Sequence, residues 1–225
     1  MNIPALQNSL LILILGAYLV QGFELIFWPV HSQFTTLELL KTGFNGTARA
    51  VFPGVTCSEP VACALSLLGT LLSIGTFLLP MVVLLFPEVY LLMAPIQGGQ
   101  NPVVTILAML CLAGGSVCTL FGVAAFRTRG LTDREEDSVL ITSGIFGLCR
   151  NPISLGLLGI VAGFLLALPS WVGLCGTGIY GLNTHFRVKL EEGALEQRFG
   201  IVYRQYKHRV GRYFPKILSP LECAE

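Results

Sequence analysis

Two apolar runs that begin and end beside arginine constrain the fold of this chain more than any other feature. The runs cover residues 153–168 and 171–186, with Pro169 at the turn between them and Arg150 and Arg187 just outside. As helices they form arms of about 24 Å, slightly shorter than the ~30 Å hydrocarbon layer of a membrane. The sequence therefore predicts a transmembrane hairpin whose two arginines meet at one membrane face. A charge at such an edge is costly unless it has a partner, so Arg150 is a candidate functional residue.

The composition also requires a membrane. Of the 225 residues, 53% are hydrophobic and 12% are charged, and the mean hydropathy is +0.73. Soluble domains carry about 25% charged residues, so this composition excludes a soluble globular domain. Twelve of the 14 lysines and arginines lie at or after Arg127. Because short basic loops stay in the cytosol, we expect residues 127–150 and the tail after Arg187 to be cytosolic.

We expect an all-α, multi-pass membrane helix bundle with five or six spans, and six are favoured. Residues 10–28 and 102–126 each have the length and apolar character of one span. Residues 60–95 are too long for a single span, which predicts a break at Pro80 or Pro87.

With six spans the amino terminus is cytosolic and residues 30–59 lie outside. Asn45 in that loop begins a glycosylation sequon, which chance explains better, and Cys57 and Cys63 would be able to pair there. The seven cysteines show no metal-ligand spacing, so we expect most of them to pack as small apolar residues. We expect no cleavable signal, because no basic residue precedes the first apolar run, and no prenylation signal at Cys223.

The stretch GTGIYG at residues 176–181 fits a dinucleotide-binding pattern, but it lies inside the second apolar run and no strand precedes it. We therefore reject a Rossmann loop. Small residues let helices approach closely in lipid. These glycines, with Gly159 and Gly163 on the first arm, predict close packing between the two arms of the hairpin.

The residues after the hairpin carry most of the charge. Arg187 and Glu191 are about one helical turn apart, with Glu192 beside them. Beyond them, apolar and basic residues alternate at helical spacing, which predicts a basic amphipathic helix lying on anionic headgroups. The apolar stripe is Phe199, Tyr203, Tyr206 and Val210, and the basic residues are Arg198, Arg204, Lys207, Arg209 and Arg212.

Each feature has a simpler explanation when it is taken alone. Asn151 and Pro152 make a good helix start, an exposed pair such as Arg187 and Glu191 contributes little, and tyrosine stripes usually pack. The hairpin nevertheless brings the two charged clusters to one membrane surface, which indicates a pocket.

These residues together resemble a known family. TSG (142–144), RNPISLG (150–156), LPSW (168–171) and RVKLEEGALEQRFGIVYRQYKHRVGRYFP (187–215) are similar to motifs of the isoprenylcysteine carboxyl methyltransferases and the related phospholipid methyltransferases. The resemblance covers roughly residues 105–217. Asn151 and Ser154 stand where the family has histidine and tyrosine, from which we expect altered specificity rather than lost activity. The chain therefore divides into a variable transmembrane region (1–101), a methyltransferase-like core (102–217) and a tail (218–225).

The resemblance implies S-adenosylmethionine in a cytosolic pocket and a lipid-like acceptor that enters from the bilayer. The charges suit this cofactor, because an arginine at a helix start binds a carboxylate and a glutamate binds an ammonium group or ribose hydroxyls. Catalytic roles fall to Arg187, as the anchor of a carboxylate acceptor, and to Glu191. An amine or thiol acceptor would instead need a base, for which His185 is the candidate. The expected cofactor-binding residues are Arg150, Asn151, Pro152, Glu191, Glu192 and Tyr203.

The leading hypothesis is a membrane methyltransferase that O-methylates a prenylcysteine carboxylate or a similar lipophilic acceptor. A phospholipid amine or a small thiol is the alternative acceptor. An NADPH-dependent sterol-type membrane reductase and a non-catalytic scaffold are the hypotheses from other classes. We expect a multi-pass protein of the endoplasmic reticulum in a eukaryote, or of the inner membrane in a prokaryote, with lipids as partners and neither nucleic acid nor metal.

Overall fold

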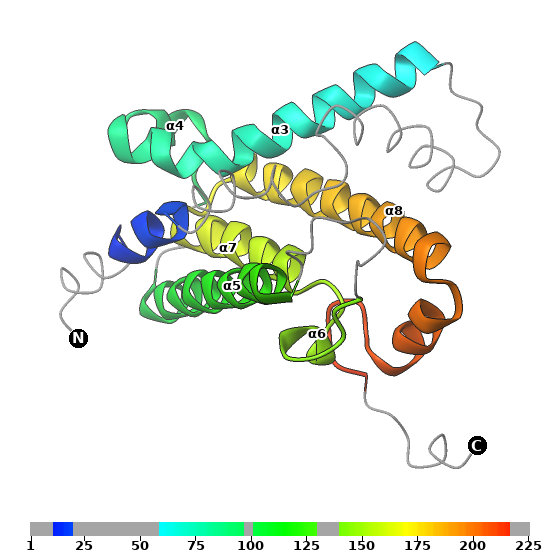
Figure 1. The fold of residues 1–225 in the computed structure, drawn as a ribbon. Coiled ribbons are helices and arrows are strands. Elements are labelled where there is room, and N and C mark those ends of the chain that lie inside the picture. The colour runs from blue at the N-terminus through cyan, green and yellow to red at the C-terminus, as the bar shows by residue number, and fades with distance from the viewer. Residues whose placement is uncertain (1–10, 20–58, 97–100, 130–139, 217–225) are drawn as a thin grey trace.

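The computed structural model describes residues 11–19, 59–96, 101–129 and 140–216, and every regular element in these ranges is a helix (Figure 1). The predicted all-α class is thus confirmed for the described part of the chain. Residues 11–19 form a helix. The other helices are α3 (Glu59–Leu85), α4 (Val89–Leu92), α5 (Pro102–Arg129), α6 (Ile145–Leu148), α7 (Pro152–Ala167) and α8 (Trp171–Arg209).

One helix in the described ranges is long and apolar enough to cross a bilayer, and it is the segment Pro102–Ala125 of α5. The segments Leu71–Leu85 of α3 and Pro152–Ala167 of α7 are apolar but shorter. The count of five or six spans therefore stays a prediction. The sequon at Asn45 and the cysteines at positions 57 and 223 lie outside the described residues.

Glycines bring α5 and α7 into close contact along their length. A Cβ atom added to Gly115 would lie 2.6 Å from the carbonyl oxygen of Gly156, which leaves no room for a side chain. Gly159 and Gly163 face α5 as well, so their predicted contact with the second arm of the hairpin is wrong. The second arm packs its own glycine, Gly176, against α3. Helix order in space, α5, α7, α8 and α3, explains the difference (Figure 1).

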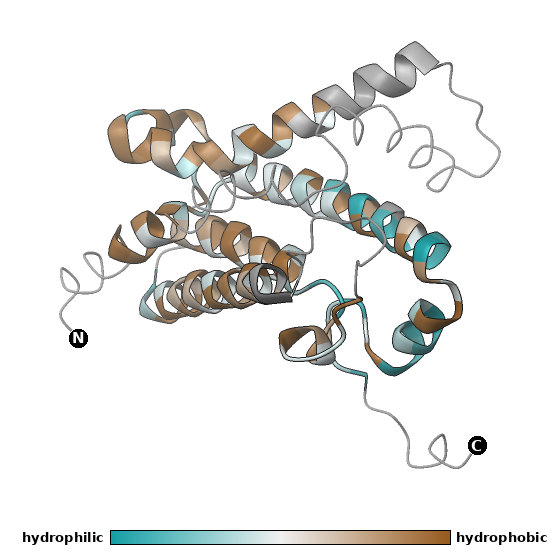
Figure 2. Ribbon diagram, viewed as in Figure 1, coloured by the Kyte–Doolittle hydropathy of each residue, from teal (hydrophilic) through white to brown (hydrophobic). Residues whose placement is uncertain are grey.

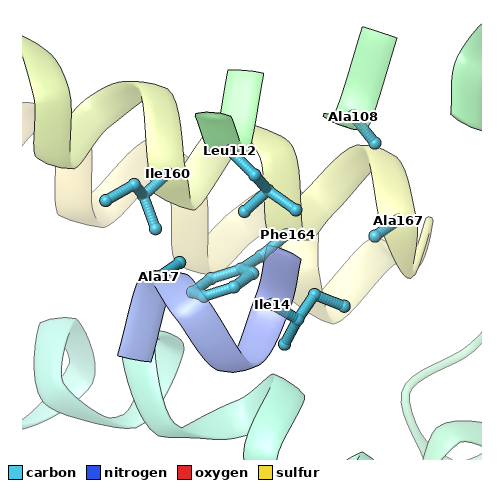
Figure 3. Packing of buried hydrophobic residues seen from close by; sticks show 7 residues of the cluster. All are labelled: Ile14, Ala17, Ala108, Leu112, Ile160, Phe164 and Ala167. Carbon is cyan, nitrogen blue, oxygen red and sulfur yellow. The ribbon is translucent and has the colours of Figure 1, made fainter. Parts of the chain in front are cut away.

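The apolar core lies where residues 11–19 meet α5 and α7 (Figure 3). Phe164 is at its centre, and the ring of Tyr18 stacks on it with 5.2 Å between ring centroids. In lipid, where burial of apolar surface gives no hydrophobic gain, the close van der Waals packing of these side chains stabilises the helix contacts. The buried members of this cluster are Ile14, Ala17, Ala108, Leu112, Ile160, Phe164 and Ala167.

The break predicted within residues 60–95 falls at Pro87, and α3 continues through Pro80. A proline inside a helix disturbs the backbone hydrogen bonds of its turn. Here the hydroxyl of Tyr18 enters that turn: it donates to the Phe77 carbonyl at 2.6 Å and accepts from the Met81 amide at 3.1 Å. Because α3 is one helix and α4 has four residues, the second crossing that a count of six requires is not found there.

The predicted hairpin turn is confirmed. Helix α7 ends at Ala167, and α8 begins at Trp171 after Ser170, whose hydroxyl accepts from the Gly173 amide at 3.1 Å. This is an ordinary N-cap interaction. Residues 93–96 cover the turn with backbone hydrogen bonds, so its polar groups have partners inside the protein.

Helix α8 continues straight through the predicted end of the second arm and bends sharply at Gly200, which has φ 54° and ψ −122°. The last part of the helix therefore folds back toward α6 (Figure 1), and hydrophilic residues gather at this end of the molecule (Figure 2). The apolar stripe of Tyr203, Tyr206 and Val210 is buried against protein, including Leu140. The expectation that this stripe rests on the bilayer is wrong, because the bend turns it inward.

Candidate functional site

A buried carboxylate, that of Glu192, is the centre of the charged end of the molecule. Its side chain is 4% exposed. Arg212 binds both of its oxygens, with 2.8 Å between Nη2 and Oε2 and 3.1 Å between Nε and Oε1. Arg150 Nη2 lies 3.1 Å from Oε1, and Asn151 Nδ2 donates to the same oxygen at 3.1 Å. Three side chains from two distant segments therefore share one carboxylate.

Backbone contacts hold those two segments side by side. The amide of Arg150 donates to the Gly211 carbonyl at 2.9 Å, and the amide of Asn151 donates to the Arg212 carbonyl at 3.2 Å. Arg150 Nη1 also donates to the carbonyl of Lys207 at 3.0 Å. A Cβ atom at Gly211 would overlap the carbonyl of Phe214, so this tight path requires glycine.

Asn151 and Pro152 occupy the helix start that the sequence predicts, with Pro152 buried at the first turn of α7. The asparagine side chain makes no capping hydrogen bond to α7. Its amide instead donates to Glu192 and, at 3.4 Å, to the Arg212 carbonyl. Asn151 thus serves the charged cluster rather than the helix. Ser154, the second departure from the family pattern, is buried within α7.

The electrostatics follow from this arrangement. Burial alone would raise the pKa of Glu192, but the hydrogen bonds and charge of Arg212, the charge of Arg150 and the Asn151 amide together lower it. The hydrogen bond from Glu192 in turn raises the pKa of Arg212. Both groups are therefore ionised at neutral pH.

Arg187 and Glu191 form a second ion pair on α8, with 3.5 Å between Arg187 Nε and Glu191 Oε1. Both side chains are partly exposed, at 39% and 29%. Burial raises the pKa of Glu191 and the nearby Glu192 raises it further, while Arg187 lowers it in part. A carboxylate with a raised pKa at a partly open position is a typical feature of functional sites.

Two tyrosines pack beneath the buried carboxylate. Tyr206 donates its hydroxyl proton to the Phe146 carbonyl at 2.7 Å. Tyr203 is 1% exposed, and its hydroxyl has no hydrogen-bond partner among the described residues. Burial, together with the negative charge of Glu192, raises the pKa of Tyr203 to about 12. Since unsatisfied buried polar atoms are rare, this hydroxyl is a candidate for binding a ligand atom.

The fold brings together three residues that the sequence singled out, namely Arg150, Asn151 and Glu192. Tyr203 lies close enough for the charges of Glu192 and Arg150 to act on its pKa. Two participants were missed by the sequence reasoning. Arg212, which we assigned to the headgroup-facing surface, clamps Glu192, and Tyr213 lies 3.4 Å from His185. Gly211 was a usable signal, because a glycine commonly follows the end of a helix. Arg212 and Tyr213 come after it, where helical spacing no longer predicts which way a side chain faces.

Comparison with known proteins gives one match. Residues 103–201 match the family model described as phospholipid methyltransferase, which covers α5, α6, α7 and most of α8. This family is also that of the isoprenylcysteine methyltransferase-like enzymes, so the resemblance predicted from the motifs is confirmed. No curated protein and no solved structure matches the chain.

Proposed function

Because residues 103–201 match the phospholipid methyltransferase family model, we propose that this protein is a membrane methyltransferase that uses S-adenosylmethionine and acts on a lipophilic acceptor. The observation that carries the proposal is the Glu192 cluster, which joins the two halves of the family-like motif, residues 150–151 and 187–215, at one end of the hairpin. The buried hydroxyl of Tyr203, which has no partner among the described residues, supports a binding role for the cluster in addition to a structural one.

The donors at this end suit a cofactor that carries a carboxylate. Tyr203 Oη and Arg150 Nε are both buried and make no hydrogen bond among the described residues. We assign the binding of the methionine carboxylate to these two groups, the shaping of the pocket to Pro152, and the ammonium group or ribose to Glu191. Glu192 and Asn151 act by holding Arg150 in place. When bound, the cofactor supplies an electrophilic methyl group on a sulfonium.

The protein's own contribution is alignment and exclusion of water. Methyl transfer is an in-line displacement, and correct positioning of two reactants is worth about 7 to 11 kcal/mol. Arg187 and Glu191 are partly exposed, which makes them suitable for contact with an acceptor at the edge of the site. For a carboxylate acceptor Arg187 is the anchor, and no general base is needed.

Two acceptors have specific support. The motif resemblance favours the carboxylate of a prenylcysteine, and the description of the matched family favours the amine of a phospholipid. Both are lipophilic, which agrees with an α5 helix that can span a bilayer. We place the protein in a membrane as a multi-pass protein with its charged end in the cytosol, in the endoplasmic reticulum or in a bacterial inner membrane.

The test is binding of radiolabelled S-adenosylmethionine to the purified protein in detergent. We expect saturable binding that NADPH does not displace, and affinity at least about 10-fold weaker in Arg150→Ala and in Glu191→Gln, as lost charge-assisted hydrogen bonds predict. Arg204→Ala is the matched control, because Arg204 is exposed and pairs with Glu196 outside the site.

Displacement by NADPH would favour the reductase hypothesis instead. Absence of binding in the wild type, in a preparation that unfolds cooperatively, would leave the scaffold hypothesis and overturn the proposal. Normal binding in both site variants would place the cofactor elsewhere.

A further inference from the structure

His185 lies on α8 two residues before Arg187, at the inner edge of the charged end. Its Nδ1 atom is 3.4 Å from the hydroxyl of Tyr213, and the two rings are 6.2 Å apart between centroids. Tyr213 comes from the segment that returns after the bend at Gly200 and is partly buried. At this distance the Tyr213 hydroxyl is able to hydrogen-bond one nitrogen of the imidazole, which leaves the other nitrogen available for proton transfer.

The charged groups around His185 come from both packed segments. Lys189 and Glu192 face it from α8, and Arg212 faces it from the returning segment. Tyr213 in turn interacts electrostatically with the buried cluster, through Arg212 and Glu192, and with the partly exposed pair of Arg187 and Glu191. An acceptor that contacts both groups of residues therefore lies near the His185–Tyr213 contact.

The state of Arg187 bears on the acceptor's charge. Its guanidinium is already 3.5 Å from the carboxylate of Glu191. An anionic acceptor that uses Arg187 as its anchor has to compete with this intramolecular carboxylate. An acceptor that is neutral or cationic does not have to displace Glu191 from Arg187.

We propose that His185 accepts a proton during methyl transfer, and that the acceptor is a lipophilic amine or thiol that carries a proton on its attacking atom. This inference rests on the proposed function. The proposed tautomer carries its proton on Nδ1 and donates it to Tyr213 Oη, so that Nε2 presents its lone pair to the acceptor. Nε2 takes the proton from the ammonium or thiol, the freed lone pair forms the bond to the methyl carbon, and the bond from that carbon to the donor's sulfonium sulfur breaks to give a thioether. Tyr213 is a positioning residue for the imidazole.

The experiment compares three acceptors with the full-length protein in nanodiscs: dioleoylphosphatidylethanolamine, dodecanethiol and farnesylated N-acetylcysteine, whose nucleophile is a carboxylate. The variants are His185→Gln and Tyr213→Phe. His208→Gln is the matched control, because His208 is exposed in the last turn of α8. Each variant is first tested for binding of S-adenosylmethionine, which separates a failure of the proposed function from a failure of this inference.

We expect the wild type to methylate the amine or the thiol, with a rate that rises with pH through the imidazole range. His185→Gln should lower kcat for that acceptor by about 100-fold or more, with the cofactor's dissociation constant and the acceptor's KM unchanged. With dodecanethiol this defect should shrink at alkaline pH, where the acceptor is already a thiolate. Tyr213→Phe should have a smaller effect and a displaced pH profile, and His208→Gln should have none.

A readout without turnover completes the test. Diethyl pyrocarbonate modifies accessible histidines, and the dodecanethiol or lipid acceptor should protect His185, but not His208, when no methyl donor is present. Cofactor binding combined with methylation of the carboxylate probe alone would overturn the inference and leave the proposed function standing. A His185→Gln variant with the wild-type rate and pH profile would overturn it as well.

Discussion

The two ends of the α7–α8 hairpin satisfy their polar groups in different ways. At the turn end, backbone groups of residues 93–96 bond to backbone groups around Pro169 and Trp171. At the charged end, side chains of Arg150, Asn151 and Arg212 enclose the side chain of Glu192. A backbone contact tolerates many side chains, whereas a buried carboxylate needs particular partners. We therefore expect substitutions of side chains to cost more stability at the charged end than at the turn end.

The strongest test of this difference removes the carboxylate. Glu192→Ala leaves two guanidinium groups without their buried partner, and loss of one member of a buried ion pair costs about 3 to 5 kcal/mol. We expect a large drop in the unfolding midpoint measured by chemical denaturation in detergent. Glu196→Ala removes a partly exposed carboxylate that also binds two cations, and it should change the midpoint less. Equal effects of the two variants would contradict the distinction between buried and exposed clusters.

The second prediction concerns the contact between α5 and α7, which runs along α7 between the two ends of the hairpin. Gly115→Ala places a methyl group against the Gly156 backbone and Ile160, so α5 and α7 have to separate. Such overpacking costs about 1 to 3 kcal/mol. Gly114→Ala is the neighbouring control, because no atom lies within 4 Å of its added Cβ. A stability loss for Gly114→Ala as large as that for Gly115→Ala would show that the helices do not pack on this face.

The bend that forms the charged end depends on Gly200. Its φ of 54° with ψ −122° is a conformation that other residues rarely adopt, and holding alanine there costs of order 1 to 3 kcal/mol. Gly200→Ala should lower stability and weaken cofactor binding, as measured by denaturation and by ligand titration. Gly193→Ala, within the regular part of α8, should be neutral or slightly stabilising.

The turn end should respond weakly to a comparable change. Tyr90→Phe removes one hydrogen bond, from the Tyr90 hydroxyl to the Pro169 carbonyl at 2.9 Å. The net contribution of such a bond is about 1 kcal/mol. We expect a small decrease in stability and no change in cofactor affinity. A loss of cofactor binding in this variant would show that the two ends are coupled.

The smallest expected effect has the opposite sign and depends on pH. The pKa of Glu191 is raised by burial, so its ionised form destabilises the folded state once the pH exceeds the carboxyl's ordinary value near 4.5. Glu191→Gln should match the wild type in stability at pH 4 and become slightly more stable as the pH rises toward 7. Thermal unfolding across that range measures it. A destabilised Glu191→Gln at pH 7 would mean that its pair with Arg187 outweighs burial.

Local patterns predicted the boundaries of the hairpin and half of the charged site. Proline after asparagine fixed the start of α7, Pro169 fixed the turn, and matching basic ends brought Arg150 to the residues after Arg187. The reversal at Gly200 was not predicted, because glycine at a helix-compatible position gives no sign of its φ angle. Helical spacing showed that Tyr203 and its neighbours form a stripe, but it does not distinguish a stripe that faces lipid from one that faces protein.

The hydroxyl of Tyr18 within α3 has a consequence for how the chain assembles during synthesis. In lipid, a backbone amide without an acceptor is costly, and the Met81 amide has the hydroxyl of Tyr18 as its acceptor. The ribosome completes Tyr18 long before Pro80, so the partner is already present when this turn of α3 emerges. In a chain with phenylalanine at position 18, α3 would enter the membrane with the Met81 amide lacking this acceptor. Residues 11–19 would also lose the two hydrogen bonds that hold them beside α3.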